Sequence, residues 1–379
     1  MQDHLQDLGI RGIWLIPVTK NADGDHGDAT TDFRDLGANT IDMTPVFLAG
    51  SNHKYDTADY TRIDPMFGSN ADFERLTREA RQRGMRVILD TSLNHTGSDS
   101  LYFNRYGSHA SRGAFQTARI DAGSPYADWY SFKPAETDPE RQYRGWVGVP
   151  DLPDLPELNK NSPAVRNFFY RDKDAVMKQW LDRGAAGWRM DVAPWMPDDF
   201  WREWRTAIKQ HKPDALTVAK TWFGVSKYFL GDMFDSTMNY IFRNSVLEYA
   251  AGGKARALYG NIELMREAYP PQAFYALMNL LSSHDQARAL HQFGWHADKD
   301  SDKDSDKDSD PQDPATIAQA KQRLLLAVFF QMTFPGAPTV YYGDEVGVTG
   351  GDVPATAAPI PGPTWAPCPT CNCVPNSSA

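Results

Sequence analysis

Ionisable side chains follow several short apolar runs of this chain, at the points where the runs end. Asp90 ends the run 85–89, Asp191 ends the run 187–190, and His284 and Asp285 close the run 276–281. Carboxylates and imidazoles of this kind can transfer protons, attack a substrate or hydrogen-bond it. A core would not tolerate them unpaired, so we interpret them as a candidate site at the ends of buried strands.

The elements that must position these residues alternate between strand and helix. Predicted helices separate the apolar runs, at residues 70–83, 162–182, 198–210 and 317–332. Alternating βα units predict an α/β fold with a parallel sheet. Polar side chains gathered at the carboxyl ends of such strands are typical of a (β/α)₈ barrel.

Four ordered motifs carry a family resemblance. They are Asp90-Thr91-Ser92-Leu93-Asn94-His95, Gly187-Trp188-Arg189-Met190-Asp191, Ala219-Lys220-Thr221-Trp222 and Ser282-Ser283-His284-Asp285. Together they resemble the catalytic signature of the α-amylase family of glycoside hydrolases, family 13. Leu155-Pro156-Glu157-Leu158-Asn159 resembles the region seen in the neopullulanase and cyclomaltodextrinase subgroup. Four ordered motifs are a strong signal, whereas one alone would be weak.

The resemblance implies a TIM barrel with a small inserted domain after the third strand, and a retaining glycosidase. Asp191 would be the nucleophile, held by Arg189, and Asp285 would stabilise the oxocarbenium-like transition state. The implied substrates are starch, maltooligosaccharides or cyclodextrins, through α-1,4 bonds with α-1,6 as an alternative. The residues implied to bind substrate are Tyr55, Asp90, His95, Arg189, Trp222 and His284.

Lys220 stands where the resemblance expects the glutamic acid that protonates the leaving group. The reference pKa of lysine is already near 10.4, and the negative charges of Asp191 and Asp285 would also keep its ammonium protonated. We therefore expect impaired activity. The sequence leaves open an engineered inactive variant, a sequencing error and a natural pseudoenzyme that only binds carbohydrate.

The sequence predicts four parts. Residues 1–95 would begin the barrel, 96–159 would form the inserted domain, 160–350 would complete the barrel with a low-complexity loop at 298–310, and 351–379 would be a disordered tail. Residues 7–18 nearly repeat residues 35–46, while the family's first strand and its C-terminal β-sandwich are not recognisable. Either the chain is truncated or rearranged, or residues 12–18 fill the position of the first strand.

The bulk properties exclude some partners. A net charge of −10 argues against nucleic acid and anionic membrane surfaces, and no apolar run is long enough to span a bilayer. No signal peptide is recognised, which favours the cytoplasm, and the oligomeric state is not predicted. No cofactor is predicted. Cys368, Cys371 and Cys373 lack a fourth metal ligand, and the 298–310 loop lacks the glycine and glutamate of a calcium loop. A structural calcium ion elsewhere stays open.

Overall fold

The computed structural model describes residues 12–15, 40–43, 45–51, 53–145, 154–224, 226–295 and 313–351. The predicted loop at 298–310, the tail with its three cysteines and most of the first 39 residues lie outside the described residues.

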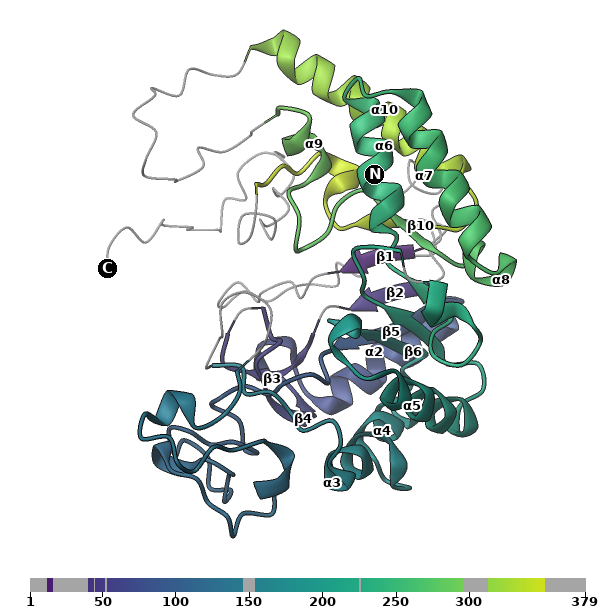
Figure 1. The fold of residues 1–379 in the computed structure, drawn as a ribbon. Helices are drawn as coiled ribbons and strands as arrows, with labels where there is room; N and C mark the ends of the chain where they lie inside the picture. Colours follow the sequence, from purple (N-terminus) through teal and green to yellow (C-terminus); the bar gives the residue numbers. More distant parts are fainter. Residues whose placement is uncertain are drawn as a thin grey trace, which may run out of the picture.

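Eight parallel strands form one curled sheet at the centre of the molecule (Figure 1). In the order of the sheet they are β8 (Ser236–Thr237), β7 (Leu216–Ala219), β6 (Gly187–Met190), β5 (Arg86–Thr91), β2 (Thr40–Met43), β1 (Gly12–Leu15), β10 (Ala337–Tyr341) and β9 (Met278–Leu280). A parallel bridge between Met238 and Met278 joins the two outermost strands, and the amide of Asn239 donates to the carbonyl of Met278 at 2.8 Å. The sheet therefore closes on itself, and the predicted (β/α)₈ barrel is confirmed.

The first strand of the barrel comes from the near-repeat. β1 pairs in parallel with β2, with Gly12 opposite Thr40 and Leu15 opposite Met43, and its other edge pairs with β10. The prediction that residues 12–18 lie as a strand beside residues 39–46 is confirmed for Gly12–Leu15. Because an open barrel would leave strand edges unpaired, this segment completes the ring of hydrogen bonds.

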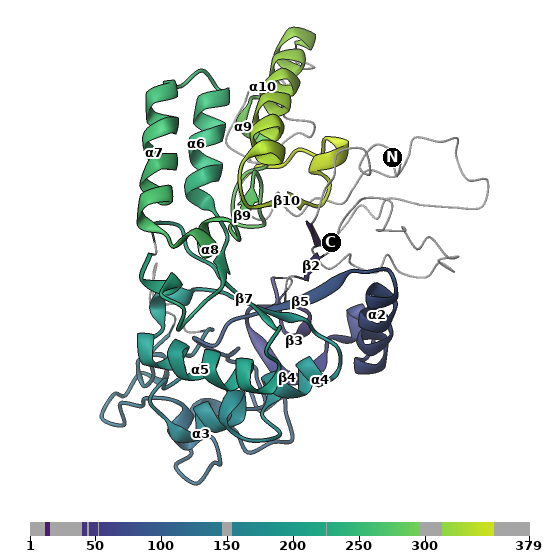
Figure 2. The same ribbon diagram turned by 90° about the vertical axis from the view of Figure 1, so that its right-hand side faces the viewer.

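Helices cover the barrel on both sides. In both views, α6 (Tyr240–Ala250), α7 (Ala255–Ala268) and α10 (Pro314–Thr333) lie on one side of the sheet, while α3 (Pro163–Arg166), α4 (Val176–Asp182) and α5 (Asp198–His211) lie on the other (Figures 1 and 2). The remaining helices are α2 (Asn70–Gln82), α8 (Pro271–Phe274) and α9 (Ala289–Gln292). α5 shows why such segments fold locally, since it buries Phe200, Trp201, Trp204 and Ile208 on one face.

One predicted helix is wrong as a single element. Residues 162–182 form α3, a π-helical turn at Asn167–Arg171 and then, after a break, α4. Asp172 is extended, and the ammonium of Lys178 donates to the carbonyls of Arg171 and Asp172 at this break. Residues 172–174 are charged and exposed, so no buried apolar face sustains the helix there.

The segment after β5 forms a lobe built from short 3₁₀ turns and isolated bridges (Figure 1). Its described part has an aromatic core in which Phe103 packs against Phe115, Tyr130 and Tyr143 with ring centroids 4.8–5.1 Å apart. An antiparallel bridge from His95 to Glu157 ties both ends of the lobe to the barrel. The domain boundaries at 95 and 159 stay a prediction.

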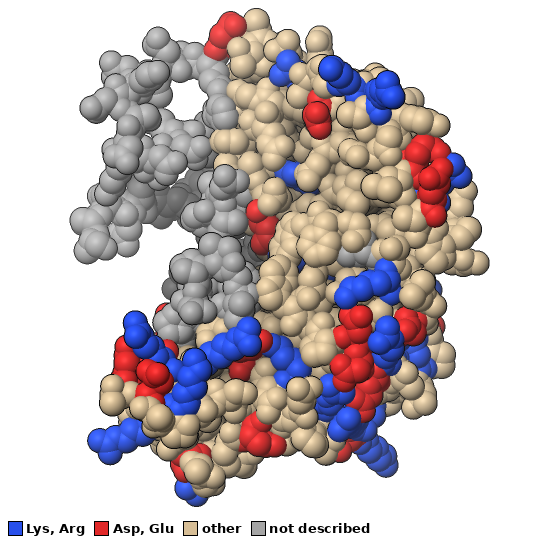
Figure 3. Space-filling view, in the orientation of Figure 1, with Lys and Arg blue, Asp and Glu red and all other residues tan. Residues whose placement is uncertain are grey.

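The hairpin β3 (Phe47–Ala49) and β4 (Thr57–Ile63) lies outside the main sheet and was not predicted. Its connection carries Tyr55. On the face drawn in Figure 3, acidic and basic side chains adjoin one another mainly over the lower half. None of the described helices is both long and apolar enough to cross a membrane.

Candidate functional site

The side chains predicted from the strand ends come together at the carboxyl end of the barrel. Asp90 lies in β5, while Asp191 and Lys220 directly follow β6 and β7. The backbone ladder continues past the strands, because the amide of Asp191 donates to the carbonyl of Thr91 at 2.9 Å and that of Lys220 donates to Met190 at 3.0 Å. These bonds fix the backbone next to each functional side chain.

Arg189 is the centre of a first cluster, which we call the Arg189 cluster, with Asp90, Asp191 and Tyr55. Its Nη1 lies 2.8 Å from Asp90 Oδ2, 2.7 Å from Asp191 Oδ1 and 2.9 Å from the hydroxyl of Tyr55. The hydroxyl of Tyr55 in turn donates to Asp90 Oδ2 at 2.8 Å. The side chains of Arg189 and Asp90 are fully buried. Buried charges require this kind of pairing, so the cluster holds Asp191 in one orientation.

Burial dominates the ionisation of Asp90. It raises the pKa of Asp90 to about 7, although the charge and hydrogen bonds of Arg189 act in the opposite direction. The pKa of Arg189 itself lies well above its usual value, because Asp90, Tyr55 and Asp191 outweigh the burial that lowers it. Arg189 is therefore a fixed positive charge behind Asp191.

Lys220 is the centre of a second cluster, the Lys220 cluster, with Asp191, Asp285 and Trp222. Its Nζ lies 3.0 Å from Asp191 Oδ1 and contacts Asp285 Oδ2. The same nitrogen lies 4.5 Å from the centroid of the Trp222 ring, a cation–π contact. The structure thus brings Asp191, Lys220 and Asp285 together, with the ammonium between the two carboxylates.

The two carboxylates keep this lysine charged. Burial alone would lower the pKa of Lys220, but the charges of Asp191 and Asp285 raise it above its usual value. In return, the pKa values of Asp191 and Asp285 lie below their usual range, since Lys220 and Arg189, with His284 for Asp285, outweigh the burial that raises them. At neutral pH the cluster is one ammonium between two carboxylates.

Two histidines border the carboxylates. His284 Nε2 lies 3.0 Å from the hydroxyl of Tyr55 and 3.3 Å from Asp285 Oδ1, and its ring stacks on that of Tyr55. His95 is buried, with its Nδ1 3.3 Å from the side-chain nitrogen Nδ2 of Asn94. Burial lowers the pKa of both imidazoles to about 4, so both are neutral at pH 7 and can donate and accept hydrogen bonds.

Aromatic rings flank the charged groups. The half-buried Trp222 packs edge-on against Trp195 with ring centroids 5.7 Å apart, and the hydroxyl of Tyr55 contacts Arg189 Nη1. Flat apolar faces beside hydrogen-bonding groups suit a ligand with both polar edges and apolar faces.

Asp42 is a buried residue beside the site that was not predicted. It lies in β2, opposite Ile88 of β5, and neither carboxylate oxygen has a hydrogen-bond partner among the described residues. Burial and the charge of Asp90 raise its pKa well above the usual value, which favours the protonated carboxyl. A signal was present, because Asp42 takes the place of Trp14 in the near-repeat and puts a charge in an apolar strand.

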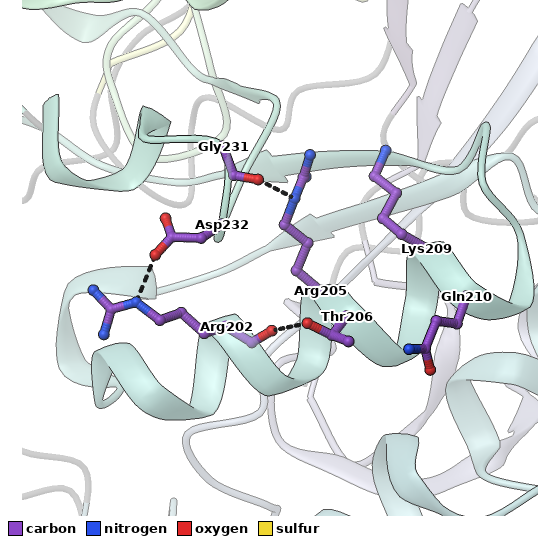
Figure 4. Close-up of a pocket in the computed structure, with 7 residues that line it drawn as sticks. All are labelled: Arg202, Arg205, Thr206, Lys209, Gln210, Gly231 and Asp232. Carbon is purple, nitrogen blue, oxygen red and sulfur yellow. Dashed lines mark hydrogen bonds and ion pairs between the residues drawn. The ribbon is translucent and has the colours of Figure 1, made fainter.

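A basic pocket lies beside α5, and its charged side chains serve a structural role. It is lined by Arg202, Arg205, Thr206, Lys209, Gln210, Gly231 and Asp232 (Figure 4). Arg202 pairs with Asp232 at 2.6 Å, and Arg205 and Lys209 both pair with Asp235. The basic groups of this pocket therefore have carboxylate partners of their own. Within the described ranges, no group of three or more acidic, histidine or cysteine side chains could hold a metal ion.

Comparison with known proteins agrees with this geometry. The profile of the family described as "Alpha amylase, catalytic domain" matches residues 33–359. An amylopullulanase from Thermoanaerobacterium saccharolyticum is 40% identical over 344 residues, which cover 84% of this chain and 26% of that protein. Neopullulanase 2 from Thermoactinomyces vulgaris is 37% identical over 328 residues, covering 86% of this chain and 49% of that protein.

Solved structures show the same likeness. The cyclic α-maltosyl-(1→6)-maltose hydrolase from Arthrobacter globiformis, in complex with maltose, superposes with a TM-score of 0.75 and 29% identity, over 96% of this chain and 79% of that one. The chain spans only about a quarter to a half of the length of the curated relatives named above.

Proposed function

The chain belongs to the α-amylase family of glycoside hydrolases, and from this premise we propose that it binds α-linked glucans and carries the retaining machinery of the family in a form that Lys220 impairs. The proposed substrates are starch, maltooligosaccharides or cyclodextrins, through α-1,4 bonds with α-1,6 as an alternative. The names of the relatives support this range, since they include an amylopullulanase, a neopullulanase and a cyclomaltodextrinase.

Asp191 is the proposed nucleophile. A retaining glycosidase needs one ionised carboxylate that attacks the anomeric carbon. Its lowered pKa and its 2.7 Å contact with Arg189 support this role, because both keep an oxygen negative and oriented. Asp285 then stabilises the positive charge that develops on the sugar ring.

The other site residues are proposed to hold the sugar. Neutral His95 and His284 can donate hydrogen bonds to hydroxyls at pH 7, and Tyr55 and Trp222 offer rings for stacking. Asp90 acts through Arg189 and Tyr55, which it hydrogen-bonds.

Lys220 is the residue that limits the proposed hydrolytic activity. A retaining enzyme needs an acid that protonates the leaving oxygen, and loss of such help removes about 10²–10⁴ of rate. The raised pKa of Lys220 means that its ammonium gives up no proton at neutral pH. Its contacts with both Asp191 and Asp285 also put it in the space where the acid and the scissile bond would meet.

A second candidate function is carbohydrate binding without catalysis. The same contacts favour it, because an ammonium fixed against the nucleophile can prevent attack altogether. Both candidates predict binding, and only turnover separates them.

The test combines calorimetric titration with maltoheptaose and measurement of new reducing ends from maltoheptaose and soluble starch. We expect saturable binding, weakened by Tyr55→Ala, with turnover far below the 1–10³ s⁻¹ typical of enzymes. Lys212→Met is the matched control, since Lys212 lies just before the other end of β7, where its ammonium donates to the carbonyl of Ala185. Absence of binding would refute the proposal, and ordinary amylase rates would refute the role given to Lys220.

A further inference from the structure

Lys220 does more than remove an acid from the site, because it also places a positive charge beside Asp191. We propose that it adapts the site to glucosyl donors whose leaving group is an anion, with α-glucosyl phosphate as the substrate class, and that the glucosyl unit is transferred through Asp191. This inference rests on the proposed function, because it needs Asp191 as the nucleophile and a sugar bound beside it.

The two kinds of leaving group make opposite demands. A sugar hydroxyl is a poor leaving group unless a proton reaches its oxygen, which a charged ammonium does not supply at neutral pH. A phosphate leaves as a stable anion and needs no proton. What it needs is a positive charge and N–H donors at the departing oxygen, and these are what a fixed ammonium offers.

The position of Lys220 fits this task. Its Nζ lies 3.0 Å from the oxygen of Asp191 that Arg189 also holds, and it contacts Asp285 on the other side. It therefore borders the point where a bond to Asp191 would form and a leaving group would separate. Lysine carries three N–H donors on a flexible stem, so its ammonium can move from Asp285 onto a phosphate oxygen without leaving the site.

The charges of the site also favour a donor with a phosphate leaving group. Arg189 and Lys220 are positive, Asp191 and Asp285 are negative, and both histidines are neutral at pH 7. A glutamate at position 220, once ionised, would make the site two charge units more negative than this lysine does. A phosphate dianion therefore meets much less repulsion here than in the same site with an ionised glutamate in place of Lys220.

The reaction balances without a further reagent. An oxygen of Asp191 attacks the anomeric carbon, the bond from that carbon to the phosphate oxygen breaks, and the electron pair leaves with phosphate. A hydroxyl of water or of a sugar then attacks the same carbon, and the bond to Asp191 breaks. The proton of that hydroxyl goes to the released phosphate dianion, which serves as the base.

The experiment measures phosphate released from α-glucosyl phosphate with maltotriose as acceptor, and separately reducing ends from maltoheptaose. The variants are Lys220→Met, Lys220→Glu and Asp191→Asn, with Lys212→Met as control. We expect the unmodified protein and the control to release phosphate at equal rates, Lys220→Met to be about 10²-fold slower, and Asp191→Asn to be inactive. Lys220→Glu should show a crossover, with slower phosphate release and faster cleavage of maltoheptaose.

Equal phosphate release by the unmodified protein and Lys220→Met, or faster release by Lys220→Glu, would overturn the proposal. Lys220→Gln serves as a second uncharged variant if Lys220→Met does not melt cooperatively. α-Glucosyl fluoride separates the two levels of inference. If fluoride release depends on Asp191 but no phosphate is released, the phosphate proposal is overturned and the role of Asp191 as nucleophile is kept. If neither donor reacts and maltoheptaose does not bind, the phosphate proposal and the proposed function are both refuted.

Discussion

The Arg189 cluster and the Lys220 cluster share one arrangement, a buried cation between two carboxylates, and they share Asp191. They differ in what surrounds them. Arg189 and Asp90 are fully buried, whereas the side chain of Asp285 is 25% exposed. Arg189 lies behind Asp191, within the barrel, while Lys220 lies at the open end where a sugar would bind. In our proposal, the same electrostatic arrangement thus supports the nucleophile Asp191 in one place and obstructs it in the other.

The largest effect is expected from breaking the Arg189 cluster. Arg189→Met leaves Asp90 and Asp191 without their common cation, and removal of one partner of a buried ion pair costs about 3–5 kcal/mol. Urea unfolding at pH 7 measures this loss. Arg202→Met is the control, because its ion pair with Asp232 is largely exposed and such pairs contribute about 0–1 kcal/mol. Equal losses in both variants would show that burial does not strengthen the ion pairs of the Arg189 cluster.

Lys220→Glu is expected to have the next largest effect, on activity rather than stability. It restores a carboxylic acid beside Asp191 and should raise hydrolysis of maltooligosaccharides at least about 100-fold. Release of reducing ends from maltoheptaose measures it, with Lys212→Glu as the control at the other end of β7. A folded but inactive Lys220→Glu protein would place the defect elsewhere in the barrel.

The sequence predicted the convergence of Asp191, Lys220 and Asp285 because the carboxyl ends of parallel strands meet at one end of a barrel. It also predicted the strand at Gly12–Leu15, since a ring of strands needs eight members and the near-repeat offered one. It also placed Asp191 and Asp285 beside Lys220, but it did not predict the burial of Asp42. That burial depends on side-chain directions inside the barrel, which a local pattern does not contain. The break at Asp172 was missed because helical propensity continues through it while the supporting apolar face does not.

Breaking the Lys220 cluster should cost less stability than breaking the Arg189 cluster. Lys220→Met leaves Asp191 paired with Arg189 and Asp285 partly exposed, so we expect a loss of about 1–3 kcal/mol at pH 7. The folded pKa values of Asp191 and Asp285 are depressed and that of Lys220 is raised. The stabilisation is therefore present between the unfolded values near 3.9 and 10.4, and it is lost as the pH falls below about 4. Urea unfolding at pH 7 and pH 3.5 should show the difference between the two proteins shrinking in acid; a constant difference would mean that lost packing, and not charge, explains it.

The smallest expected effect is a change in the pKa of His284 that His95 does not share. Burial is the main reason that the pKa of His284 and of His95 is lowered to about 4, but the positive charge of Lys220 also lowers it for His284, whereas Lys160 acts on His95. Removing the charge in Lys220→Met should therefore raise the pKa of His284 and leave that of His95 nearly unchanged. NMR titration of ¹³C-labelled histidine measures both in one sample, with His284→Gln and His95→Gln to assign the signals. Equal shifts in both would mean that the substitution changes burial throughout the site, and the contact between Lys220 and Asp285 would then not be the specific link to His284 that the geometry indicates.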